Sequence, residues 1–531
     1  LLLASAEANI GPAPPPWWVP APKPALDEVL AEANQQKEMH SQRVLNAAAM
    51  DLRLGLEIGS IFASDELFVR IKEIEPMASQ LLRIMHDWIV NFVASQQIHF
   101  TSLAQGLVMR EERAAIEDHL ADSLLDWTER TFREGQGSLI RRLTADALSG
   151  MVAIYHAPNP KGNPRTGQRI YRVDPKVVFP VFGRDGLDRV YAVYEARYDE
   201  MMANFGDGDG PITTAIQKIA RTGQGRGKKR IDPELCYEFA GFWDRQRVVL
   251  TWKGEQIHEE DHNLYVCPWH IGVPNWRNAS GSRDGAGYDF LSNPYPGAPT
   301  DSSGRPLIGT TRQRDMARMY EPFLTPWLTT IDKVEKMLTR LGYGVDVALD
   351  PALVWNRSEA GGDTGPPEIQ RYRRGVTEIY GTGPDAEKLD ILPINPINES
   401  FPPWMELFLV EIKAALPSII LQGQSIGTQA SGSALDIINE LGATHFQHPV
   451  EFMPMLLKEV AHRDLTYIKE WSDLYGEGLA VPTASPNGYS AKMVTLTKEM
   501  LERSGCYVQC EMSRSSLAGL VGAATAISIL D

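Results

Sequence analysis

Residues 402–416 predict a helix that is apolar on almost every side, and this segment limits the possible folds more than any other. Its large apolar side chains are Met405, Leu407, Phe408, Leu409, Val410 and Ile412. A helix that is hydrophobic all round is buried, either inside a large protein or in a membrane. The segment is shorter than the roughly 20 residues that a membrane span needs. We therefore expect protein to cover it on all sides.

The composition is that of an ordinary globular protein. The chain has 531 residues, of which 43% are hydrophobic and 23% are charged, and this length is enough for more than one core. Residues 1–25 are rich in proline, which prevents a helix or a central strand, so we expect an extended arm there. The chain starts at Leu1 with no basic flank before its apolar residues. We therefore expect a fragment without a secretory signal.

Charge and cysteine usage exclude several classes of protein. The formal net charge is −16, whereas tight binding to nucleic acid is supplied by clustered lysines and arginines. The cysteines are Cys236, Cys267, Cys506 and Cys510. Four cysteines in so long a chain make no disulfide scaffold, and their spacing matches no zinc pattern. The longest apolar stretch, residues 517–530, is too short for a membrane helix. A chain that folds in a reducing cytoplasm fits these features.

The hydrophobic period divides the first half of the chain into two blocks. Residues 26–151 have helical spacing, with apolar stripes on two predicted helices. These stripes are Leu81, Ile84, Met85, Trp88 and Phe92, then Ile116, Leu120, Leu124 and Trp127. Residues 152–270 alternate with a period of two and contain the turn signal Lys253-Gly254, which predicts antiparallel strands. Residues 206–230 inside this block predict a polar, glycine-rich loop, and 271–311 predict an irregular connection.

The second half predicts two helices on either side of a small β segment. The first helix starts near Pro326 within residues 312–341 and ends at Gly342, with an apolar stripe. That stripe is Trp327, Ile331, Val334, Leu338 and Leu341. Residues 342–400 predict short strands and turns, 401–417 the apolar helix, and 418–433 a loop of small residues. A long helix over 434–475 contains Pro449 and Pro454, which predict kinks. A strand follows at 506–512.

The segment from His258 to His262 satisfies H-E-x-x-H, in which two histidines one helical turn apart bind zinc. Here the match falls in a predicted hairpin, and in a strand these positions lie about 13 Å apart. A polar strand end is the competing interpretation.

Three other motifs are incomplete. Gly423 to Gly427 satisfies G-x-S-x-G around Ser425, but no βαβ series precedes it. Asp436 and several histidines do follow Ser425 in the order of a hydrolase, so a serine hydrolase stays open. The Gly-Lys of residues 227–228 lacks both the earlier glycine and the following Ser or Thr of a phosphate loop. The acidic residues near 207 lack the glutamate of a calcium loop.

The order of these parts over about residues 40–531 resembles that of the portal proteins of tailed bacteriophages. The local matches are Leu416 to Leu421 (LPSIIL) and Ala430 to Ala434 (ASGSA). They look like the proline-containing segment and the small-residue stretch that precede the long helix of that family. The resemblance implies an α+β portal fold that assembles into a closed ring, of twelve copies in virions, around a DNA channel.

The resemblance also assigns a part of that fold to each segment. It implies a wing at 26–311, a first stem helix at 312–341, a clip at 342–400, a second stem helix at 401–417, a tunnel loop at 418–433, a spine helix at 434–475, and a wing return with the start of a crown at 476–531. The ring would cover the apolar helix 402–416 with neighbouring copies. A channel lined by an acidic protein would let DNA slide without holding it.

The resemblance implies three sets of site residues. The tunnel-loop candidates for touching DNA are Gln424, Ser425, Thr428, Gln429 and Ser431. The clip candidates for docking a partner are Arg371, Arg373 and Arg374, and the stem candidates are Lys333, Lys336 and Arg340.

The function that the resemblance implies is packaging and ejection of double-stranded DNA at a capsid vertex of the virion, after assembly in the host cytoplasm. The implied partners are further copies of the chain, the major capsid protein, the terminase large subunit, the head-to-tail adaptor and the DNA. No cofactor, membrane or enzymatic activity is expected. The alternative is a hydrolase that uses zinc on His258 and His262 or the nucleophile Ser425. Bound zinc, or labelling of Ser425 by an acylating probe, would support that alternative.

Overall fold

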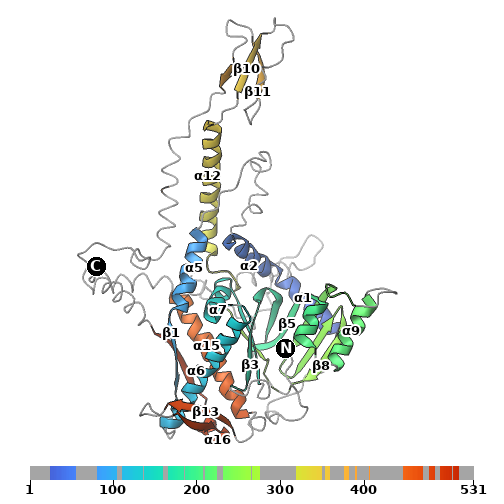
Figure 1. Cartoon of the computed structure of the whole chain (residues 1–531), viewed down its shortest axis with the longest axis vertical. Helices are drawn as coiled ribbons and strands as arrows, with labels where there is room; N and C mark the ends of the chain where they lie inside the picture. Colours follow the sequence, from blue (N-terminus) through green and yellow to red (C-terminus); the bar gives the residue numbers. More distant parts are fainter. Residues whose placement is uncertain are drawn as a thin grey trace, which may run out of the picture. The chain divides into compact units, whose positions relative to one another are not determined.

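In the computed structural model (Figure 1), helices and strands are mixed along the chain and the strands fall into separate sheets, in agreement with an α+β fold. The structure describes residues 24–55, 81–103, 110–135, 137–158, 166–183, 186–206, 208, 210–223, 231–262, 264, 266–274, 319–349, 353–358, 376–381, 389–391, 406, 447–470, 478–484, 491–504 and 506–513. Two units can be separated: unit 1 contains residues 1–50, 86–323 and 446–531, and unit 2 contains 51–85 and 324–445.

The described helices differ widely in length. They are α1 (Leu26–Met39), α2 (Ser41–Leu54), α5 (Leu81–Ala94), α6 (Arg110–Arg133), α7 (Leu139–Leu148), α8 (Tyr198–Phe205), α9 (Pro211–Gly223), α12 (Thr325–Leu349), α15 (Gln447–Glu470) and α16 (Lys498–Ser504), with a short 3-10 helix at Pro175–Val177. Helices α5 and α6 confirm the helices predicted around Trp88 and Trp127. The stripe on α6 is buried or half-buried as expected, whereas on α5 the predicted stripe is wrong in part, because Ile84 is 52% exposed and Leu82 and Ile89 are buried instead.

A five-stranded antiparallel sheet is the largest sheet of unit 1. Its strands stand in chain order: β4 (Val178–Gly183), β5 (Gly186–Arg197), β6 (Cys236–Trp243), β7 (Arg247–Trp252) and β8 (Glu255–Asp261). The predicted turn between β7 and β8 is confirmed. Lys253 and Gly254 both have positive φ, 56° and 72°, as tight hairpins require because their twist must match that of the strands.

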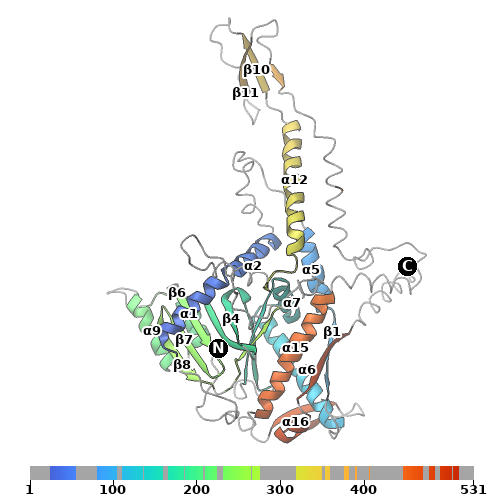
Figure 2. The same ribbon diagram turned by 180° about the vertical axis from the view of Figure 1, so that it is seen from behind.

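Both faces of this sheet are covered by helices. Successive side chains of a strand point to opposite faces of a sheet, so neighbouring residues of β5 belong to two different cores. Val190 and Ala192 of β5 belong to a core shared with α8 and α9, whereas Tyr191 and Val193 pack with Val29 of α1. Helix α1 therefore lies on one face and α9 on the other (Figure 2). Helix α8 belongs to the same core as α9.

Helix α9 corrects one prediction from the sequence. Residues 206–230 were expected to form a loop, but residues 211–223 form a helix. Pro211 stands at its first position, where the missing N–H costs nothing, and Ile212, Ile216 and Ile219 are buried in the sheet's core. The isoleucines recur at helical spacing, and the surrounding glycines and charges hid this pattern. The remaining residues 224–230 lie outside the described part of the chain.

A second, three-stranded sheet lies between the first sheet and the long helix α15. Strand β2 (Val152–Pro158) is its centre, between β3 (Gln168–Val173) and β9 (Trp269–Gly272), and all pairs are antiparallel. Every residue of β2 is buried. Tyr155 points into the core of the five-stranded sheet and packs edge-on against Trp243 and Trp269. On the other face, His156 packs against Tyr467 of α15.

A further core joins α6 and α15 to two β ribbons. Its buried residues include Ile116 and Leu120 of α6 and Leu465 of α15. The ribbons are β13 (Leu479–Ala484) with β14 (Ala491–Leu496), and β1 (Gln97–Ser102) with β15 (Val508–Ser513). Strand β15 confirms the strand predicted at 506–512. Strand β1 was missed in a block expected to be mostly helical, because its only partner among the described residues lies at the far end of the chain.

Unit 2 contains α12 and a small three-stranded sheet. In that sheet β10 (Leu353–Ser358) pairs parallel with β11 (Val376–Gly381) and antiparallel with β12 (Leu389–Ile391). Short strands were expected at 342–400. Helix α12 starts where predicted but continues through Gly342 to Leu349, so the predicted end was wrong. A glycine inside a helix costs only about 1 kcal/mol relative to alanine, which is too little to end a long helix.

Helix α15 falls within the predicted long helix 434–475. It is one element that contains Pro454 and has Pro449 in its first turn, where proline is tolerated. A kink at Pro454 stays a prediction, and residues 434–446 and 471–475 lie outside the described part.

Candidate functional site

The basic stem candidates lie on α12. Lys333 and Arg340 are exposed and Lys336 is half-buried, whereas Ile331 and Val334 of the predicted stripe are buried. The stripe also includes two polar residues that the sequence did not single out. Glu335 and Thr339 are 4% and 1% exposed, and the Thr339 hydroxyl donates to the Glu335 backbone carbonyl at 2.8 Å. A hydroxyl that donates to the backbone carbonyl four residues earlier has its donor satisfied, so it can remain buried on the apolar face of a helix.

Helix α12 is also held by an ion pair within unit 2. Arg53, at the end of α2, pairs with Asp332. The pair places one acidic residue of α12 beside a cation from a distant part of the sequence.

The tunnel-loop candidates Gln424, Ser425, Thr428, Gln429 and Ser431 lie outside the described residues. The clip candidates Arg371, Arg373 and Arg374 lie outside them as well, although the strands β10 and β11 are described on either side of that cluster. These candidates remain predictions.

The H-E-x-x-H match has the geometry of a strand. His258 lies on β8, and its Nε2 is 3.0 Å from a carboxylate oxygen of Glu260. His262 is buried, its Nε2 donates to the Asp244 carbonyl at 2.9 Å, and its Nδ1 accepts from the Leu264 N–H at 3.2 Å. Both of its ring nitrogens are therefore engaged. Within the described part of the chain no group of three or more His, Cys, Asp or Glu residues could hold a metal ion.

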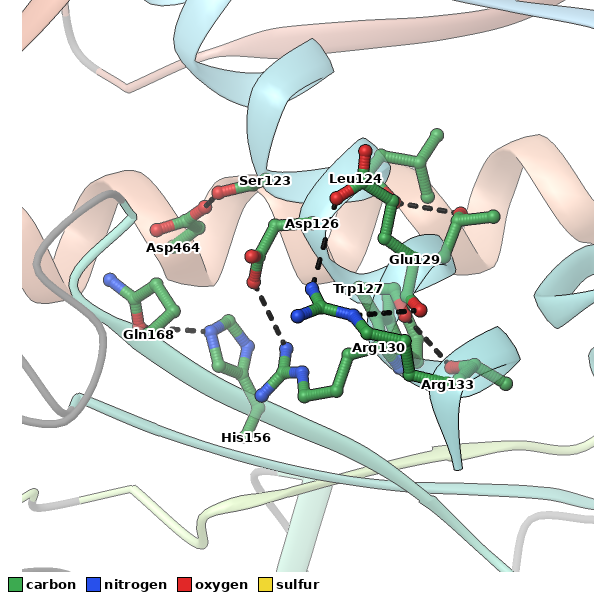
Figure 3. Close-up of polar contacts among 12 residues, drawn as sticks. Ser123, Leu124, Asp126, Trp127, Glu129, Arg130, Arg133, His156, Gln168 and Asp464 are labelled. Atoms are coloured by element: carbon green, nitrogen blue, oxygen red, sulfur yellow. Dashed lines mark hydrogen bonds and ion pairs between the residues drawn. The ribbon is translucent and has the colours of Figure 1, made fainter. Parts of the chain in front are cut away.

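A cluster of buried and half-buried polar side chains lies along α15, and we name it the α15 joint. It consists of His119 and Ser123 of α6, Arg463, Asp464 and Tyr467 of α15, and His156 and His270 of the three-stranded sheet. Ser123 and Asp464 point toward each other (Figure 3), and the Ser123 hydroxyl donates to Asp464 Oδ2 at 2.8 Å. His119 Nε2 lies 3.3 Å from the same oxygen.

The sheet side of the α15 joint contains two buried histidines in series. The ring atoms His156 Nδ1 and His270 Nε2 are 3.1 Å apart, and His156 Nε2 is 3.2 Å from Gln168 Oε1. Because an amide oxygen only accepts, His156 donates from Nε2 and must accept through Nδ1 from His270. Burial lowers the pKa of His156 to about 4 and that of His270 well below its ordinary value. Both rings are neutral near pH 7.

Two further side chains of α15 donate hydrogen bonds to backbone carbonyls in and next to the three-stranded sheet. Arg463 donates to the carbonyls of Cys267 and Trp269, both at 2.8 Å, and the Tyr467 hydroxyl donates to the carbonyl of His156 at 3.1 Å. Hydrogen bonds to charged donors contribute about 1.5–3 kcal/mol each. Arg463, Asp464 and Tyr467 thus fasten one stretch of α15 to two sheet strands and to α6.

The α15 joint lacks the arrangement of a catalytic triad. A serine nucleophile needs a histidine that takes its proton, with a carboxylate behind that histidine. Here the Ser123 hydroxyl bonds the carboxylate directly, and His119, Ser123 and Asp464 are 1%, 6% and 1% exposed. A substrate has no access to such a group. The joint is a structural tie between α6, α15 and the three-stranded sheet.

Sequence reasoning missed the α15 joint. His119 and Ser123 stand one turn apart within the apolar pattern of α6, and this was the one available signal. Their partner Asp464 lies 341 positions further along the chain from Ser123. Only the fold brings these residues together.

No model of a known protein family matches this sequence, and no curated protein matches it. Among the helices of the described residues, none has both the length and the apolar character that a membrane span requires.

Proposed function

We propose that this chain is a portal protein of a tailed bacteriophage, a subunit of a ring at one capsid vertex through which double-stranded DNA enters and leaves. In this proposal unit 1 supplies the wing, α12 the first stem helix, and the sheet of β10, β11 and β12 the clip. The function is mechanical, and the energy for DNA movement comes from a separate terminase.

The observation that carries the proposal is the insertion of residues 324–445, the larger segment of unit 2, between two segments of unit 1. The chain leaves unit 1 after Phe323, forms the 25-residue helix α12 and a small sheet, and re-enters unit 1 at Phe446 just before α15. At 1.5 Å per residue, α12 is about 37 Å long. A long helix that leads to a small sheet, followed by a return into the first unit, is the order expected of a stem and clip between two parts of a wing.

The charge of the chain supports the same proposal. A ring multiplies the net charge of −16 per copy, and a negative channel repels phosphates. DNA that moves must not be held by many tight contacts. The capsid protein, the terminase and the head-to-tail adaptor are the further partners in this proposal, with the clip as the docking region for the last two.

Electron microscopy of the purified chain, with native mass spectrometry for the number of copies, tests the proposal. We expect rings with an axial hole wide enough for a duplex of about 20 Å, the diameter of B-form DNA with its grooves. Compact monomers or dimers at micromolar concentration would contradict it. Bound zinc, or acylation of Ser425 in such monomers, would favour the hydrolase alternative instead.

A further inference from the structure

We propose that a cavity between α6 and α15 is a hydration site in which one ordered water molecule binds Asp464. The cavity has a volume of about 20 Å³, and a water molecule needs about 10–15 Å³. Its lining is mostly apolar and includes Leu120, Trp127 and Val460, with Ser123 and Asp464 as the polar members. The inference concerns unit 1 alone and does not depend on the proposed function.

The observation that points to a ligand is an oxygen atom without a partner. Asp464 is 1% exposed, and its Oδ2 accepts the hydrogen bond from Ser123. Its other oxygen, Oδ1, has no hydrogen-bond partner among the described residues. The large majority of buried side-chain polar atoms have a partner in the protein or in ordered water. The Asp464 side chain lines the cavity, and we infer that the missing donor lies there.

Water fits this cavity better than the other small guests. A calcium or magnesium ion takes about six or more oxygen ligands, whereas the lining supplies one carboxylate and one hydroxyl. An apolar guest leaves Oδ1 unsatisfied. A water molecule donates one hydrogen to Asp464 Oδ1, and the Ser123 hydroxyl can accept the other while it still donates to Oδ2. Two polar partners are the minimum for a buried water.

A water molecule in this position belongs to the α15 joint, because it bonds residues of both helices. Ser123 belongs to α6 and Asp464 to α15, and both point into the space between the helices (Figure 3). The water adds a second hydrogen-bonded connection between these helices beside the direct bond of 2.8 Å.

A crystal structure of the full chain, determined with and without xenon pressure, tests the inference directly. We expect one spherical density peak within hydrogen-bonding distance of Asp464 Oδ1 and no xenon in the cavity. Xenon bound there, or an empty cavity, would overturn it. A peak surrounded by the short oxygen contacts of a metal ion would overturn it too, since the guest would then be a cation.

A solution measurement uses a matched pair of variants. Ala461 lines the cavity, whereas Ala121 is exposed on α6, and both lie inside helices. We expect Ala461→Val to remove one long-lived internal water, counted by the magnetic relaxation dispersion of water oxygen-17. Ala121→Val leaves the number unchanged. The same number of long-lived waters in the wild type and in both variants contradicts the inference. If Ala461→Val fails to fold, the crystal structure of the wild type decides.

Discussion

At the scale of single residues, the interior of unit 1 contains several histidines that burial keeps neutral. Burial lowers the pKa of His156 and His262 to about 4 each, and that of His40, beside Arg43, to about 3. Their hydrogen bonds also require the neutral ring, because His262 accepts from the Leu264 N–H and His156 accepts from His270. If either acceptor nitrogen bound a proton, it would become a donor that faces another N–H donor, and the hydrogen bond would be lost.

Because these buried histidines are neutral in the folded chain, we predict that acid lowers the free energy of unfolding. Below pH 6.5 the unfolded chain binds a proton on each histidine that the folded chain does not bind. The free energy of unfolding therefore falls by about 1.4 kcal/mol per pH unit and per histidine between pH 6.5 and about 4. Urea unfolding at pH 7.5, 6.0 and 5.0 measures this slope. In His262→Gln we expect lower stability at pH 7.5 but a shallower slope. An unchanged slope in that variant would show that His262 does not contribute.

Gly241 on β6 gives a second prediction at this scale. A Cβ at this position would overlap the buried ring of Trp243, so we expect Gly241→Ala to lower the free energy of unfolding by about 1–3 kcal/mol. Gly55 is the control, because a Cβ there meets backbone oxygens only at 3.4 Å and beyond. For Gly55→Ala we expect no change or a gain of up to about 1 kcal/mol. Equal effects in urea unfolding would contradict this account.

At the scale of elements, a buried cation attaches the N-terminal helix α2 to the start of the five-stranded sheet. Arg43 of α2 donates to the carbonyls of Pro175 at 2.7 Å and Val178 at 2.8 Å, and its guanidinium lies over the rings of Phe179 and Tyr320. Burial lowers its pKa to about 10, so the group stays charged. The side chain attaches α2 to the start of β4, while Val29 and Ala33 of α1 fill the core over the sheet.

Replacement of Arg43 tests this attachment. In Arg43→Met the carbonyls of Pro175 and Val178 lose buried donors, and we expect a loss of about 2–4 kcal/mol in the free energy of unfolding. The matched control is Lys37→Met on α1, which removes a salt bridge of 2.7 Å with Glu238 that is about half exposed at both ends. Exposed pairs contribute at most about 1 kcal/mol. A control variant as unstable as Arg43→Met would show that the helices are not held at Arg43.

Elements with a local signal were predictable from the sequence, and elements with distant partners were not. The period of Ile116, Leu120 and Trp127 was sufficient for α6, and Lys253-Gly254 was sufficient for the β7–β8 hairpin. Strand β1 depends on β15 and was missed. The α15 joint was missed for the same reason, since neither Ser123 nor Asp464 forms a recognisable motif in its own neighbourhood.

At the scale of the whole molecule, the excess of acidic residues bears on the proposed passage of DNA. With 68 acidic and 52 basic residues, the average field of a ring repels a duplex. Basic residues such as Lys333 and Arg340 on α12 are too few to reverse that sign. In the proposed channel the walls would therefore guide the duplex by confining it and would not bind it tightly.

This balance predicts weak binding to double-stranded DNA. At 150 mM salt we expect no retardation of a 30-base-pair duplex at micromolar concentrations of the chain, because few phosphate contacts release counterions. Gel mobility shift and fluorescence anisotropy at 50 and 150 mM salt measure this. A dissociation constant in the nanomolar range at 150 mM salt would contradict passive threading, whether or not rings form.

The pairing of β1 with β15 also decides when this protein can finish folding on the ribosome. Ser102 pairs with Val508, about 400 residues later. At roughly 5–20 residues per second, β1 waits on the order of 20–80 s for its partner to be synthesised. During that time the ribbon side of the α6 core has no cover, since β13, β14 and α16 also come late in the chain. This apolar side of α6 can therefore be covered only after residues 508–513 have been synthesised.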